Sequence, residues 1–224
     1  IGSQAPGLLA EADGIVAQGA ALHPLQDHVV ARLQAEVEMG HQARLTAEQR
    51  EPYTFNPGPF LADENKGMQG YLSSEPYLVE KEGGFTPDVF LIADAGYSTY
   101  ATTIETMADT IAEKPEEVKC FVEGSIKGWY NYLYGDNAAA NEAIMADNPE
   151  MTQDKIDYAI EKMKSEGIVD SGDALELGIG AMTEEKVGGF YDKMVEVGVI
   201  EDDIDWTAAF TTEFVNAKVG MDLK

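Results

Sequence analysis

Residues 87–96 read Pro-Asp-Val-Phe-Leu-Ile-Ala-Asp-Ala-Gly, and this stretch decides the predicted fold. Its centre, residues 89–93, is a continuous apolar run between a Pro-Asp start and an Asp-Ala-Gly turn. Such a run is typical of a strand that is buried on both faces of a parallel sheet. We therefore predict a buried strand over 89–93, followed by a tight bend at Gly96.

A second strand-like run, Gln-Gly-Tyr-Leu-Ser, lies at residues 69–73, and the chain beyond residue 100 has mostly helical spacing. The longest apolar stripe follows Pro115, a residue favoured in the first turn of a helix, and stops at Gly135. Strands followed by amphipathic helices indicate the α/β fold class. The residues predicted to cap later helices are Thr152, Thr183 and Asp205.

The charge balance limits the classes of partner. The chain of 224 residues has 41 acidic and 15 basic side chains, which gives a formal net charge of −26. Such a surface repels nucleic acid and anionic membranes, so neither is expected as a partner. The sequence contains no apolar run of about 18 residues, as a membrane-spanning helix would need. The single cysteine, Cys120, cannot form an intrachain disulfide and is predicted to be a small buried hydrophobe.

Motifs for catalysis, metals and cofactors are not found. The sequence holds no cysteine pair, no His-x-x-x-His, no Gly-x-Ser-x-Gly and no phosphate loop with a lysine. His23 and His28 are five residues apart, which is a poor spacing for two metal ligands on one helix face. The acidic group at residues 202–205 is interrupted by Ile204 and is interpreted as a solvated turn. We therefore predict a protein that is not an enzyme and has no metal or cofactor.

Five polar or aromatic residues are candidates for ligand binding. Asn56 ends a strand-like Tyr-Thr-Phe run, where its amide can donate and accept hydrogen bonds, although a turn before Pro57 is the simpler interpretation. Glu75 can accept a hydrogen bond from a ligand N–H, or else lie in the first turn of a helix. Tyr97 follows the predicted strand and can face a cleft, or else belong to a simple loop. Ser3 and Gln4 follow Gly2 in a stretch that can present backbone N–H groups to an anion.

Ordered segments of the chain carry a resemblance that no single motif carries. In sequence order they are IGSQA, PYTFNPGPFLAD, GYLSSEPYLVEKEGGF, PDVFLIADAGYSTYATTI, GSIKGWYNYLYGD, NPEMTQDKIDYAIEKMKSEGIVDSGDA, GIGAMT and FVNAKVGMDLK. Together they resemble the bacterial ABC-importer substrate-binding proteins related to thiamine-pyrimidine synthesis proteins, a family that also includes sulfonate, taurine and nitrate binders. The likeness covers residues 51–224 and the first five residues, whereas residues 6–49 diverge from the family pattern.

The resemblance implies a type II periplasmic-binding-protein-like α/β fold, in which two lobes close on a hinge around a small polar solute. Residues 1–88 would form the second, inserted lobe, and residues 89–224 the return hinge strand with the helical part of the first lobe. About one hundred family residues would precede Ile1, so the fold is expected to be N-terminally incomplete.

The resemblance also implies a role for the protein. It would be a periplasmic or otherwise extracytoplasmic monomer that uses Ser3, Gln4, Asn56, Glu75 and Tyr97 as ligand contacts and delivers its solute to an ABC permease. Two rival functions stay open at this point. One is a thiamine-pyrimidine synthase-like enzyme, which the lack of histidine in residues 51–224 argues against. The other is a ligand-sensing domain of the same fold.

Overall fold

The computed structural model describes residues 51–52, 56–63, 65–95 and 97–224. Within these ranges the regular secondary structure is helical, and no strand is formed. The elements are listed here in chain order: α2 (Gly58–Leu61), α3 (Glu75–Gly83), η3 (Ile92–Ala95), α4 (Ala108–Glu113), α5 (Pro115–Tyr134), α6 (Ala138–Asp147), α7 (Gln153–Ser165), α8 (Ala174–Leu177), α9 (Glu184–Glu196), η4 (Trp206–Ala209) and η5 (Met221–Leu223).

The α/β prediction is therefore wrong for the described residues, and with it the two-lobed periplasmic-binding-protein architecture that needs a parallel sheet. The predicted strand 89–93 is an irregular segment that runs into the 3₁₀ turn η3, and Val89 and Phe90 are 47% and 74% exposed. A strand is stabilised only when a neighbouring strand pairs with its backbone. Here the backbone bonds locally instead, with the Asp94 N–H donating to the Leu91 carbonyl at 3.1 Å.

The second predicted strand, residues 69–73, is also wrong. This segment ends in a turn, in which the Ser74 N–H donates to the Tyr71 carbonyl at 2.9 Å and leads directly into α3. The domain boundary between residues 88 and 89 stays a prediction. Residues 1–50, which include the divergent segment 6–49, lie outside the described residues.

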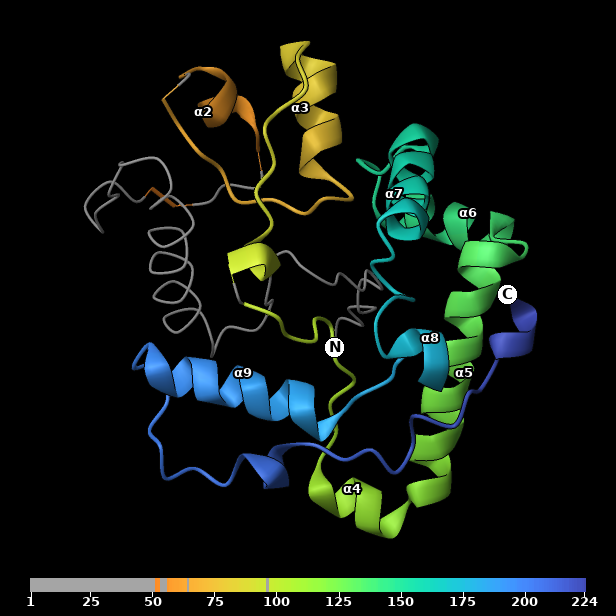
Figure 1. The fold of residues 1–224 in the computed structure, drawn as a ribbon. Helices are drawn as coiled ribbons and strands as arrows, with labels where there is room; N and C mark the ends of the chain where they lie inside the picture. The colour runs from red at the N-terminus through yellow and green to blue at the C-terminus, as the bar shows by residue number, and fades with distance from the viewer. Residues whose placement is uncertain (1–50, 53–55, 64, 96) are drawn as a thin grey trace.

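Helix α5 organises the larger core. It begins at Pro115, as predicted, and ends where the Gly135 N–H donates to the Asn131 carbonyl at 2.8 Å. One face of the helix packs against α7 and the loops that follow it, and η5 lies beside it near the C-terminus (Figure 1). The buried residues of this core are Val122, Ile126, Tyr130, Leu133, Met163, Ile168 and Ile179.

The buried stripe of α5 is rotated from the predicted one. Phe121, expected to face inward, is 62% exposed, and Cys120 is exposed rather than buried. The two residues are adjacent in the sequence and lie on the outer side of the helix, because the inward positions repeat from Val122 at intervals of three to four residues. The sequence contains apolar residues on both sides of the stripe, so spacing alone did not place its centre.

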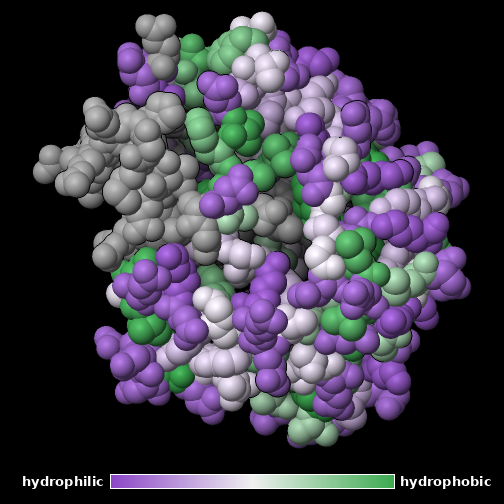
Figure 2. Space-filling model, in the orientation of Figure 1, coloured by the Kyte–Doolittle hydropathy of each residue, from purple (hydrophilic) through white to green (hydrophobic). Residues whose placement is uncertain are grey.

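A smaller core surrounds α9. Met194 and Val197 are buried there, and Ile92, Tyr97 and Phe190 pack against them. Ile92, at the start of η3, and Tyr97, beyond its end, thus pack against the core of α9, while η4 lies along the same helix. Asp205 caps η4 as predicted, with its Oδ1 accepting the Thr207 N–H at 3.2 Å, but the element is a 3₁₀ turn rather than a longer α-helix. Polar side chains cover most of the visible face (Figure 2), in keeping with the acidic composition.

The cap of α9 provides a test of the local structure. Thr183 Oγ1 accepts the Lys186 N–H at 3.3 Å, which confirms the predicted cap. We expect Thr183→Ala to lower the free energy of unfolding by about 0.5–2 kcal/mol in urea titrations. Thr152→Ala is the comparison, because Thr152 occupies the corresponding position of α7 and bonds to the exposed Asp154 carboxylate, without accepting a first-turn N–H. Equal losses in the two variants would contradict a contribution from the cap.

Candidate functional site

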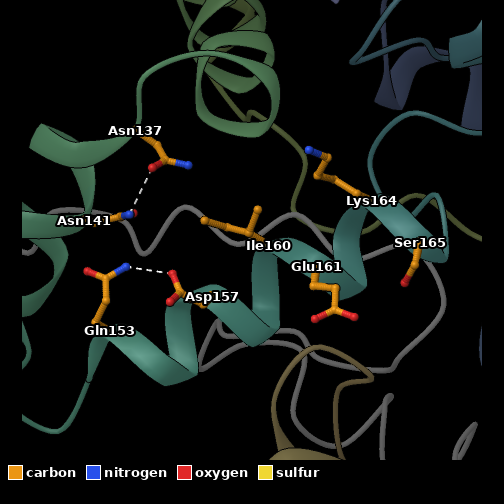
Figure 3. A pocket seen from close by; sticks show the side chains of 8 residues that line it. All are labelled: Asn137, Asn141, Gln153, Asp157, Ile160, Glu161, Lys164 and Ser165. Atoms are coloured by element: carbon orange, nitrogen blue, oxygen red, sulfur yellow. Dashed lines mark hydrogen bonds between the residues drawn. The ribbon is translucent and has the colours of Figure 1, made fainter.

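The strongest candidate site is a groove between α6 and α7. Its volume is about 590 Å³, within the range of small-molecule sites. The two helices are joined by a short turn at Asn148-Pro149, where proline prevents α6 from continuing. Figure 3 shows the side chains that line the groove, which are Asn137, Asn141, Gln153, Asp157, Ile160, Glu161, Lys164 and Ser165.

Two polar pairs, each spaced four residues apart, face one another across this groove (Figure 3). On α6, Asn141 Nδ2 donates to Asn137 Oδ1 at 3.1 Å, and Asn137 Nδ2 donates to the Tyr132 carbonyl at 2.9 Å. On α7, Gln153 Nε2 donates to Asp157 Oδ1 at 2.8 Å. These bonds fix the orientation of three amides, so the polar wall exists before any ligand binds.

Asn141 is the unusual member of this wall. The residue is only 5% exposed, and its Oδ1 atom is buried with no hydrogen-bond partner among the described residues. A buried acceptor without a donor costs about 1–3 kcal/mol. The amide nitrogen is held by Asn137, so the oxygen is the side-chain atom of Asn141 that lacks a hydrogen bond.

The rest of the groove differs along its length. Ile160 lies between the amide end and the C-terminal end of α7 and belongs to the margin of the main core. Lys164 Nζ lies 5.1 Å from the centroid of the Tyr134 ring, a cation–π distance. Burial raises the pKa of Tyr132, and the negative charge of Asp157 adds to the rise. The carboxylate of Asp157 therefore gives the amide end of the groove a negative charge.

A second groove, of about 410 Å³, lies at the start of α9. Three of its lining residues, Asp173, Thr183 and Lys186, contact Tyr100. The Tyr100 hydroxyl accepts the Thr183 N–H at 2.9 Å and donates to Asp173 Oδ2 at 3.1 Å, and Lys186 Nζ lies 4.6 Å from the Tyr100 ring centroid. This network holds the loop before α8 against α9, and we assign it a structural role.

The structure gives Asn56 and Glu75 local partners. Asn56 Oδ1 accepts the Gly58 N–H at 2.7 Å. This bond belongs to a turn at Pro57, which was the simpler of the two interpretations of Asn56 in the sequence. Glu75 lies in the first turn of α3, and one of its carboxylate oxygens accepts the Tyr71 N–H at 2.6 Å. Neither residue is among those that line the two grooves.

Tyr97 packs edge-on against Phe190, with ring centroids 5.6 Å apart, and burial raises the pKa of its hydroxyl. It too is absent from the linings of the two grooves. Ser3 and Gln4 lie outside the described residues. The structure does not bring Asn56, Glu75 and Tyr97 into one site with the groove, and their roles as ligand contacts stay predictions.

Sequence reasoning missed Asn137, Asn141, Gln153 and Asp157. The available signal was the repeated four-residue spacing of polar side chains on two consecutive helices, 137/141 and 153/157. It was weak because residues 138–140 are alanines, which made this segment resemble an ordinary short helix. Whether such a pair faces solvent or a neighbouring helix depends on how α7 packs, which is a tertiary property.

No set of three or more histidine, cysteine, aspartate or glutamate residues in the described ranges is arranged to hold a metal ion. None of the helices within those ranges is both long enough and apolar enough to cross a bilayer. Comparisons of the chain with protein-family models, curated proteins and solved structures find no match.

Proposed function

We propose that the protein binds a small polar solute in the α6–α7 groove and serves as the extracytoplasmic solute-binding component of an ABC importer. The observation that supports a binding role most directly is the buried, unpartnered Oδ1 of Asn141 in a groove of suitable volume. Native proteins satisfy nearly all buried polar atoms, so an exception in a concave site favours a ligand or water that supplies the missing hydrogen bond.

The importer role rests on the sequence. The ordered segments between residues 51 and 224 resemble the substrate-binding proteins of ABC importers, and the solute classes implied are thiamine-pyrimidine precursors, sulfonates, taurine and nitrate. The proposed site differs from the interlobe cleft expected from that family, because the described residues form no sheet to separate two lobes. An ABC permease would be the membrane partner that receives the solute.

A thermal-shift screen against these four solute classes tests the proposal. Binding to the native state alone stabilises it by about 2.7 kcal/mol at a ligand concentration of 100 times Kd. For a chain of this length, such a gain corresponds to a rise in melting temperature of about 5–10 °C. A solute that binds should then increase ATP hydrolysis by the cognate permease in proteoliposomes when the protein is added.

Asn141→Leu separates binding from folding. This variant removes the unpartnered Oδ1 together with the bond from Nδ2 to Asn137, and puts an apolar group of similar size in their place. The gain from the first change offsets the loss from the second, so we expect its stability without ligand to change by less than about 1 kcal/mol. The solute-induced rise in melting temperature should disappear. Glu142→Leu, a change to the same residue at an exposed position of α6 outside the groove lining, should keep the full rise. A rise of equal size in all three proteins, or no rise with any solute, would contradict binding in this groove.

A further inference from the structure

The amide end of the α6–α7 groove has a definite chemical preference. The Asn141 Oδ1 atom is an acceptor without a partner, whereas Nδ2 already donates one of its two N–H bonds to Asn137, whose own amide is held by the Tyr132 carbonyl. Turning the Asn141 amide over would place its Oδ1 against the Asn137 oxygen, which is unfavourable. An occupant that donates a hydrogen bond at this position would supply what Oδ1 lacks, which favours a head group with N–H bonds.

Charge adds to this preference. Asp157 lines the same groove as Asn141, and its hydrogen-bond donor Gln153 is neutral, so the carboxylate charge is not compensated by that contact. Glu161 follows one turn later on α7, and two like charges at this spacing repel one another. The only basic residue of the lining, Lys164, is placed over the Tyr134 ring at the other end of the groove.

An apolar surface continues from this acidic end. Ile160 separates the amides and Asp157 from Glu161, Lys164 and Ser165 (Figure 3). A short alkyl group can cover Ile160 while a head group remains between α6 and α7. The groove thus combines one buried acceptor, two carboxylates and one apolar surface.

Resting on the proposed binding function, we propose that this groove selects small organic cations that have N–H donors, such as alkylguanidinium or primary alkylammonium ions. The head group donates to Asn141 Oδ1 and to the Asp157 carboxylate, and the alkyl part covers Ile160. A donor-bearing cation satisfies the orphaned acceptor and relieves the repulsion between Asp157 and Glu161 at the same time.

Three probes of similar size separate charge from hydrogen bonding. N-butylguanidinium has both features, N-butylurea donates without a charge, and butyltrimethylammonium has the charge without an N–H donor. In calorimetric titrations at low ionic strength, N-butylguanidinium should bind about tenfold more tightly than either of the others. Asp157→Asn should weaken N-butylguanidinium about tenfold and change N-butylurea by less than about twofold. Asp192→Asn, a matched change on the exposed side of α9, controls for the net charge and should leave both affinities unchanged.

The outcomes distinguish this inference from the proposed function. Equal affinity for N-butylguanidinium and N-butylurea, or loss of cation binding in both aspartate variants, would overturn the selection of cations. Binding of an alkanesulfonate or nitrate that Asn141→Leu abolishes, without binding of the cation, would also overturn it while leaving solute binding intact. If no probe and no solute of the screen shows binding that depends on Asn141, both proposals fail.

Discussion

Tyr130→Ala should lower the free energy of unfolding by about 3–5 kcal/mol, as expected when a large side chain is removed from a packed core. Tyr130 lies in the middle of the buried face of α5 and is 2% exposed. Its hydroxyl accepts the Ile179 N–H at 3.2 Å. Its ring also lies beneath Gly220, where an added Cβ would come within 2.9 Å of Tyr130 Cδ2. One side chain therefore connects α5 to two later loops.

Two further variants show how much of the expected loss of stability comes from the hydroxyl group and how much from the buried ring. Tyr130→Phe keeps the ring and removes only the acceptor, so the loss should be about 1–3 kcal/mol from the buried Ile179 N–H. Phe121→Ala removes an aromatic ring from the exposed side of the same helix and should change stability by less than about 0.5 kcal/mol. Urea unfolding followed by circular dichroism measures all three. Similar losses for Tyr130→Ala and Phe121→Ala would show that α5 does not bury the face described here.

Removal of Asp170 is the second large effect. Asp170 is 6% exposed, accepts a hydrogen bond from the Tyr134 hydroxyl and forms an ion pair with Lys224 Nζ at 2.6 Å. Asp170→Ala should cost about 2–4 kcal/mol. This is below the loss typical of a fully buried pair, because Lys224 is 45% exposed and regains water when its partner is removed.

The same group predicts a pH dependence. Burial acts to raise the pKa of Asp170, but the hydrogen bonds from Lys224 and Tyr134 outweigh it and leave the pKa below the usual 3.8. A carboxyl group whose pKa is lower in the folded state contributes its full stability above pH 4 to 5, and loses it as the pH falls through the folded-state value. The stability difference between the parent and Asp170→Ala should thus be largest at pH 7 and shrink at pH 3. A constant difference across this range would contradict a charged Asp170 in the native state.

Local chemistry allowed the helices to be predicted, whereas pairing between distant segments was not predictable. The start at Pro115, the end at Gly135 and the cap at Thr183 depend on a few neighbouring residues. Residues 89–93 have the composition of a buried strand, but a strand exists only when another segment pairs with it. The resemblance to importer proteins supplied the expected sheet, and the described residues do not form it.

The candidate site shows the same division. The sequence allowed two interpretations of Glu75 and Asn56, as ligand contacts or as parts of local structure. In the structure each accepts a hydrogen bond from a nearby backbone N–H. The sequence did not predict a site at Asn141, because the burial of this side chain depends on how α7 packs against α6 after a turn of five residues. A helical asparagine is ordinary on a surface and unusual in an interior, and only the packing of the two helices decides which case applies.

The outward position of Cys120 has a practical consequence. It is the only thiol in the chain and lies on the side of α5 away from the packed core. A maleimide-linked fluorophore or spin label will therefore attach at one defined point of the parent sequence, with no engineered cysteine and no disturbance of buried side chains. Since α5 extends to Tyr134, which contacts Lys164 at the margin of the groove, the protein already contains an attachment point for optical titration.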